Sequence, residues 1–166
     1  IEKNARDAGL PPEIFYGLIR TESSFIPDIS SRVGAVGLSQ LMPATAEDMA
    51  DRIARKGGPD YRKNGKIELR DPQINLHIGA VYLNYLIEHL ENPMLALLAY
   101  NGGMGRVRRW RAGEPNLPMD LFLETIEYRE TREYGRRVLA AAAAYGYLYY
   151  GMSMEAVVAD IFKDDP

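Results

Sequence analysis

The chain of 166 residues contains no cysteine, two histidines and a single tryptophan. Without cysteine it can form no disulfide, and it has neither a thiol nucleophile nor a thiolate metal ligand. His77 and His89 fall in one expected helix, separated by about 18 Å along its axis, which is too far for them to share a metal ion. The catalytic side chains that remain are carboxylates, hydroxyls and amides, so we expect neither a metal nor an organic cofactor.

Strong charge and long apolar runs are also lacking. The net charge is −3 with 26% charged residues, whereas a nucleic-acid-binding surface would be basic. No segment approaches the roughly 18 apolar residues of a membrane span, and no N-terminal stretch resembles a signal peptide. Because residue 1 is Ile rather than Met, we expect the chain to be part of a longer protein, so the absence of a signal says little about targeting.

Apolar residues recur at helical spacing through most of the chain, and no segment alternates convincingly like a strand. Prolines mark several helix starts, since proline is tolerated in the first turn. Helices are expected from Pro12, from Pro43 through Ile53, from Pro72, from Pro93 to a glycine-rich turn at 101–105, over 106–111, from 128 to 150 and through 154–162, with loops at 26–41, 56–70 and 113–118. The alanines of 140–144 permit close helix contact. The pattern predicts one all-α domain with compact orthogonal packing.

A carboxylate occupies the apolar face of the first of these helices. Glu22 follows Leu18 by four residues and precedes Phe25 by three, which places it on the core-facing side. Burial raises the pKa of an unpaired carboxyl, and an acid that is protonated near neutral pH can serve as a general acid. A structural glutamate paired with an arginine or with backbone donors is the alternative, and position 22 alone favours it.

Four segments together carry a more specific pattern: Glu22-Ser23-Ser24-Phe25, residues 34–43 (GAVGLSQLMP), Ala99-Tyr100-Asn101-Gly102-Gly103, and residues 128–134 (YRETREY). Their order and spacing, with Asp71-Pro72, Asn75 and Gly79 between them, resemble the catalytic domain of the goose-lysozyme-like lytic transglycosylases, which cleave bacterial peptidoglycan. The resemblance covers residues 9 to 150. It implies an all-α, lysozyme-like (goose-type) catalytic domain over 1–150, to which residues 151–166 add an amphipathic tail.

The resemblance assigns roles to matching positions. Glu22 takes the place of the family's acid/base glutamate. The implied substrate-binding residues are Ser31, Gln40, Met42, Tyr100, Asn101 and Glu130. Two positions depart from the family pattern, because Ser39 stands in place of a methionine and Met104 in place of a proline; we expect these changes to affect subsite preference more than activity.

Each supporting residue also has an ordinary structural interpretation. Tyr100 suits a helical core, Ser31 a turn, and Asn101 a helix end. Gln40 could cap the next helix, Met42 could fill a gap, and Glu130 could pair with Arg132 on the surface. The functional interpretation rests on their joint occurrence at the family's spacing.

The implied reaction splits the β-1,4 bond between N-acetylmuramic acid and N-acetylglucosamine in peptidoglycan strands, in the bacterial periplasm or cell envelope. Glu22 would act first as acid and then as base, which leaves a 1,6-anhydromuramoyl product. One alternative is a lysozyme-type hydrolase that uses Glu130 or Asp28 as a second carboxylate. Another is a non-catalytic module that binds peptidoglycan.

Overall fold

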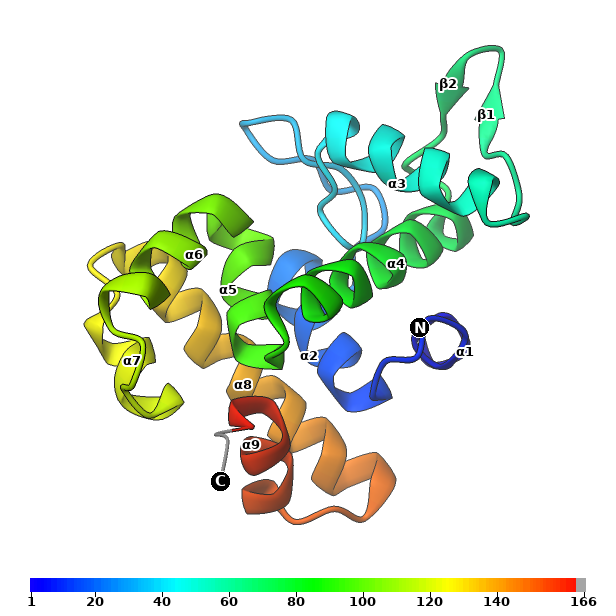
Figure 1. The fold of residues 1–166 in the computed structure, drawn as a ribbon. Helices are drawn as coiled ribbons and strands as arrows, with labels where there is room; N and C mark the ends of the chain where they lie inside the picture. The colour runs from blue at the N-terminus through cyan, green and yellow to red at the C-terminus, as the bar shows by residue number, and fades with distance from the viewer. Residues whose placement is uncertain (164–166) are drawn as a thin grey trace.

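The computed structural model describes residues 1–163 (Figure 1). Within this range the helices are α1 (Glu2–Asp7), α2 (Pro12–Ser23), α3 (Pro43–Arg55), α4 (Pro72–Leu90), α5 (Pro93–Gly102), α6 (Met104–Gly113), α7 (Met119–Thr125), α8 (Arg129–Tyr150) and α9 (Met154–Phe162). The strands β1 (Arg62–Lys63) and β2 (Lys66–Ile67) form a small antiparallel hairpin. The predicted all-α fold is confirmed.

Helix starts follow the proline signals. A proline occupies the first turn of α2, α3, α4 and α5, where its missing N–H costs no hydrogen bond. Asp71 caps α4 by accepting hydrogen bonds from the backbone N–H groups of Gln73 and Ile74. Asn92 caps α5 through Leu95 in the same way. These side chains satisfy donors that the first turn leaves unpaired.

Three short elements were not predicted. Helix α1 spans six residues of which only Ala5 is buried, and α7 spans seven residues after Pro118. The hairpin turns at Asn64 and Gly65, both with positive φ, and an Asn-Gly pair is a common hairpin signal. Two-residue strands are too short to show alternation, so the expected loop at 56–70 is partly wrong.

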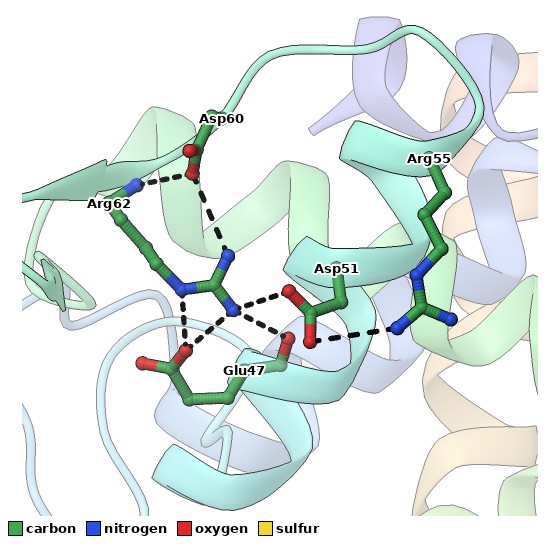
Figure 2. Close-up of polar contacts among 5 residues, drawn as sticks. All are labelled: Glu47, Asp51, Arg55, Asp60 and Arg62. Atoms are coloured by element: carbon green, nitrogen blue, oxygen red, sulfur yellow. Dashed lines mark hydrogen bonds and ion pairs between the residues drawn. The ribbon is translucent and has the colours of Figure 1, made fainter.

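An ion-pair network fixes this hairpin to α3 (Figure 2). The Arg62 guanidinium lies 2.8 Å from the Glu47 carboxylate and 2.7 Å from that of Asp51, and it also reaches Asp60 at 3.7 Å. Arg55 approaches Asp51 from the other side at 3.8 Å. Networks of this kind hold geometry better than isolated surface pairs. Figure 1 shows the hairpin and α3 together at one end of the molecule, far from α6 and α7.

The centre of the main core is the contact between α2 and α8. A Cβ placed on Gly17 would lie only 2.8 Å from the backbone N of Ala142 and the backbone O of Val138. Ala142 is fully buried, which confirms the close helix contact expected of the alanine run. Val157 and Ile161 of α9 are also fully buried in this core, so the expected tail packs into the domain over its described residues.

A second, smaller core lies under the loop that precedes α3. Its buried members are Leu41, Ala46, Met49, Ala50, Ile53, Leu69 and Ile78. Tyr82 and Tyr100 pack against both cores. The loop at 26–42 is thereby seated on α4. None of the helices in residues 1–163 combines the length and the apolar character needed to cross a bilayer.

Candidate functional site

Glu22 lies near the end of α2, partly buried against α8. The Tyr134 hydroxyl donates a 2.7 Å hydrogen bond to its Oε1. Desolvation raises the pKa of Glu22 from 4.5 to about 7, although the Tyr134 hydrogen bond and the charge of Arg137 both lower it. Among residues 1–163 no ion pair to Glu22 is formed. The alternative of a structural glutamate clamped by an arginine does not describe this geometry.

Tyr100 and Tyr134 both lie close enough to Glu22 for its charge to affect their hydroxyls. Burial raises the pKa of both phenols well above their usual value, and the negative charge of Glu22 raises them further. Both hydroxyls therefore stay protonated and act as donors. The Tyr100 hydroxyl donates to the backbone O of Ser39 at 2.9 Å, so the ring links the surroundings of Glu22 to the loop at 26–42.

Asn75 of α4 holds that loop in place. Its Nδ2 donates to the backbone O atoms of Val36 and Leu69, both at 2.9 Å, and its Oδ1 accepts from the backbone N of Ser39 at 2.7 Å. The side chain is buried, so these three bonds replace solvent for groups that would otherwise be costly to bury.

Two glycines allow this close approach of loop and helix. A Cβ on Gly37, whose φ is +79°, would lie 2.3 Å from Asn75 Nδ2. A Cβ on Gly79 would lie 2.2 Å from Ser39 Oγ. The spacing of Asn75 and Gly79 in the sequence pattern thus corresponds to the contact between loop and α4.

The predicted residues Ser31, Gln40 and Met42 all belong to this loop. Gln40 has a φ of +45°, and its Nε2 donates to the backbone O atoms of Gly37 at 2.8 Å and Ile29 at 3.2 Å. Ser31 Oγ accepts from the backbone N of Ala35 at 2.9 Å, as the turn interpretation expected. Gln40 and Ser31 therefore support the loop's conformation, whereas Met42 is 43% exposed at the start of α3.

Asn101 and Glu130 lie where α5 ends and α8 begins. The Thr131 hydroxyl donates to Asn101 Oδ1 at 2.8 Å, which ties the two helix ends together. Glu130 is exposed and makes no hydrogen bond or ion pair with residues 1–163. Arg132 donates to the backbone O atoms of Glu124 and Ile126 instead, so the expected pair between Glu130 and Arg132 is not formed.

The two departures from the family pattern occupy different surroundings. Ser39 is 0% exposed and lies against Asn75 and Gly79, so its side chain has no access to a sugar. Met104 begins α6 and packs against the main core. An effect of Ser39 on subsite preference would therefore have to act through its neighbours and not through contact with the sugar.

Comparison with known proteins bears on this arrangement. The family model for the transglycosylase SLT domain matches residues 1–122. The chain belongs to this family.

Relatives of the SLT domain include the soluble lytic murein transglycosylases of Salmonella typhimurium (38% identical over 145 residues, 86% of this chain and 21% of the relative) and Escherichia coli (36% over 140 residues, 83% and 21%). Similar structures include an inactive Glu-to-Gln mutant of the lytic transglycosylase Slt from Pseudomonas aeruginosa (37% identity, TM-score 0.79, covering 87% of this chain and 23% of that one). Another is the 70-kDa soluble lytic transglycosylase complexed with bulgecin A (34%, TM-score 0.82, 92% and 24%). The SLT domain thus spans about a fifth of the length of the relatives it matches.

Sequence reasoning missed Tyr134 as a partner of Glu22. The two residues are 112 positions apart, and Tyr134 lies beyond the part of the SLT domain that the family model matches. It stands at the end of the fourth sequence segment, where it reads as an ordinary aromatic of a long helix. The role of Asn75 in holding the loop could not be predicted either. It binds backbone groups, which every residue has, so the sequence does not identify its partners.

Proposed function

We propose that this SLT domain is a peptidoglycan lytic transglycosylase with Glu22 as its single acid and base. The observation that carries the proposal is the environment of Glu22: a carboxyl with a pKa of about 7, desolvated and free of any ion pair within the described residues. A general acid works best when its pKa lies near the working pH. The family to which the chain belongs supplies the class of substrate.

The proposed reaction needs one carboxyl used twice. Protonated Glu22 gives its proton to the oxygen between N-acetylmuramic acid and N-acetylglucosamine, and the bond from that oxygen to C1 of the muramoyl sugar breaks. The muramoyl N-acetyl group stabilises the oxocarbenium-like centre. The Glu22 carboxylate then takes the proton of the C6 hydroxyl as its oxygen bonds to C1, so no water is consumed and Glu22 ends protonated.

The neighbours of Glu22 suit both halves of this cycle. Desolvation favours the protonated acid at the start. Once the proton has left, the Tyr134 hydroxyl donates to the carboxylate and the charge of Arg137 favours the anion. Tyr100 and Tyr134 remain neutral throughout, because the pKa of each phenol is raised by burial. A pKa of about 7 leaves either state accessible near neutral pH.

A lysozyme-type hydrolase is the second candidate, and it needs a second carboxylate near the scissile bond. Glu130 and Asp28 were the predicted candidates. Both are exposed, and neither interacts with Glu22 or its tyrosines. This favours the mechanism with one carboxyl. A non-catalytic module would not require a carboxyl held at such a raised pKa.

The test is digestion of purified peptidoglycan by the parent protein and by Glu22→Gln, followed by mass spectrometry. We expect the parent to release anhydromuramoyl products, each one water lighter than a hydrolysed product. Glutamine cannot supply an acidic proton, so activity should fall by about 10²- to 10⁴-fold or more while the variant still sediments with peptidoglycan.

Asp28→Asn is the matched control and should retain activity, because the mechanism with one carboxyl gives Asp28 no role. Products that carry the extra water, together with loss of activity in Asp28→Asn or Glu130→Gln, would establish the hydrolase instead. Full activity in Glu22→Gln would remove Glu22 from the mechanism.

The place of action is proposed on the same basis. Peptidoglycan lies in the bacterial cell envelope, and the relatives include both soluble and membrane-bound lytic murein transglycosylases. We therefore assign the domain to the periplasm or cell envelope, as part of a longer protein. Its partner there is the glycan strand.

A further inference from the structure

A second concave surface lies beside α1 and the last turns of α8. It is a cavity of about 670 Å³ with an aromatic wall formed by Tyr16, Phe25, Tyr145, Tyr149 and Tyr150. Its volume is within the range of sites that take small molecules. None of the predicted substrate-binding residues lines it, and nothing in the proposed mechanism uses it.

Three of these rings form a continuous platform. The ring centroids of Tyr16 and Tyr145 are 5.4 Å apart, those of Tyr145 and Tyr149 5.8 Å, and those of Tyr16 and Tyr149 6.5 Å, with interplanar angles of 33°, 18° and 22°. In a linear stack the two outer rings would be far more widely separated than neighbours. The three centroids therefore lie at the corners of a triangle, and no two of the ring planes are tilted by more than 33°. Phe25 meets the Tyr145 ring edge-on, at 6.1 Å and 81°.

The platform is accessible and its edge is polar. Tyr149 is 69% exposed, whereas an aromatic side chain that only packs in a core buries most of its surface against its neighbours. Arg6 and Glu2, an ion pair at 2.5 Å, line the same cavity. Burial raises the pKa of Tyr16 and of Tyr150, so these hydroxyls remain donors at neutral pH. An apolar floor with donors and acceptors at its edge matches a sugar ring, which has apolar faces and a rim of hydroxyl and amide groups.

The platform stands on the two helices that hold Glu22. Tyr16 and Glu22 both belong to α2, and Tyr145 belongs to α8 together with Tyr134. Tyr145 follows Tyr134 by about 16 Å along the helix axis and, at about three full turns, on the same side of α8. Phe25, three residues after Glu22, reaches back to this platform. A rigid pair of packed helices thus fixes the cavity relative to the acid.

We propose that this aromatic cavity is an additional glycan-binding site that takes N-acetylhexosamine units of a peptidoglycan strand remote from the bond that is cleaved. The identity of the ligand rests on the proposed function, since a strand-cleaving domain meets a polymer much longer than its reacting disaccharide. Sugar faces lie on the tyrosine platform, and the hydroxyl and acetamido groups meet Arg6, Glu2 and the phenols. The site holds the strand and takes no part in the chemistry.

Tyr149→Ala tests this site in the Glu22→Gln protein, where no turnover interferes with binding. Isothermal titration with purified peptide-free glycan strands should show affinity about three- to tenfold weaker, as expected when one aromatic contact is lost. Tyr147→Ala is the matched control. Tyr147 is 58% exposed on the same helix, yet it faces the other side, about 200° around the axis from Tyr145 and Tyr149. It should bind strands like its parent.

Activity in the Glu22 protein gives the second readout. Tyr149→Ala should raise KM for intact strands and leave kcat unchanged, whereas cleavage of fragments too short to reach the cavity should not change. Thermal unfolding of both tyrosine variants checks that the fold is intact.

Equal strand affinity in Tyr149→Ala and Tyr147→Ala would overturn the proposal, as would an equal loss for long and short substrates. If the cavity binds another protein and not glycan, Tyr149→Ala will leave strand binding unchanged, which also overturns the proposal. A parent protein without lytic activity would refute the proposed function, while the titration would still decide whether the cavity binds glycan.

Discussion

At the scale of single residues, the proposed chemistry depends on the balance between groups that raise and groups that lower the pKa of Glu22. Desolvation favours the acid, while Tyr134 and Arg137 favour the carboxylate. Arg137 lies three residues after Tyr134, about 60° away around α8, and helical side chains lean toward the N-terminus and thus toward Tyr134. Arg136 lies about 160° away from Tyr134 and pairs with Glu124 and Glu133. Two adjacent arginines therefore have different electrostatic roles.

We predict that Arg137→Ala moves the alkaline limb of the pH–activity profile to higher pH. The proposed mechanism requires protonated Glu22 at the start, so activity should fall as pH rises through the pKa of this carboxyl, which is about 7. Removing a positive charge that favours the carboxylate raises this pKa further. The measurement is kcat/KM against pH, which reports groups of the free enzyme.

Arg136→Ala is the control for this experiment, because its charge is engaged on the surface with Glu124 and Glu133. Its alkaline limb should coincide with that of the parent. A limb that stays in place in Arg137→Ala, or moves to lower pH, would contradict the electrostatic role given to Arg137.

Sequence alone could single out Glu22 as a candidate because its position on an apolar helical face conflicts with its charge. Tyr100 could be placed beside it only through a motif that spans neighbouring residues. Tyr134 could not, because its hydroxyl meets Glu22 across 112 positions and only the packing of two helices creates that contact. The pKa of Glu22 was expected to be raised, yet the groups that limit the rise lie on α8.

At the scale of elements, the loop at 26–42 has little regular structure to hold its shape. Its backbone is pinned by Asn75, by the Gln40 side chain and by the Tyr100 hydroxyl. Loops that position functional groups usually rely on a rigid element beneath them. Here that element is α4, which also carries the glycine that admits Ser39.

We predict that Asn75→Ala lowers the free energy of unfolding by about 2 kcal/mol or more, since the buried backbone N–H of Ser39 and the buried backbone O of Leu69 each lose a partner, at a cost of roughly 1–3 kcal/mol each. The backbone O of Val36 keeps its bond to the N–H of Leu41. Hydrogen exchange should quicken first at residues 36–41. The measurement combines chemical denaturation with exchange mass spectrometry, and activity should fall as the loop loosens.

Asn84→Ala on the same helix serves as the control. Within residues 1–163 the Asn84 side chain bonds only to Glu88 near the surface, at 2.9 Å, so its loss should stay within about 0.5 kcal/mol. Similar losses in the two variants would mean that Asn75 does not hold the loop.

Helix positions were predictable where proline and apolar spacing agree, as at Pro12, Pro43, Pro72 and Pro93. Short elements were not, because α1 and α7 owe their order to neighbours and not to a long apolar stripe. The hairpin owes its position to Arg62, whose partners Glu47 and Asp51 lie on α3 (Figure 2). These ion pairs could not be predicted from the sequence, because only the folded structure brings the charges together.

At the scale of the whole molecule, the fold class followed from composition, spacing and resemblance, but the candidate site depends on one helix contact. Antiparallel α2 and α8 bring Glu22 to Tyr134 at one end and Tyr16 to Tyr149 at the other. Gly17 lies between these two pairs. The small residues at the crossing of α2 and α8 therefore set the distance between these helices. That distance determines the surroundings of both the Glu22 carboxyl and the aromatic platform.

We predict that Gly17→Ala impairs activity and stability together. The new Cβ would lie 2.8 Å from backbone atoms of Ala142 and Val138, which cannot move aside as a flexible side chain can. Overpacking of this kind costs about 1–3 kcal/mol, and the separation of α2 from α8 should weaken the Tyr134–Glu22 hydrogen bond.

Gly113→Ala is the control, because a Cβ at that position meets nothing within 4 Å. This substitution should stabilise the fold by about 0.4–1 kcal/mol. Thermal unfolding and turnover of peptidoglycan measure both effects. A Gly17→Ala protein with unchanged turnover would show that Glu22 does not depend on the spacing of these two helices.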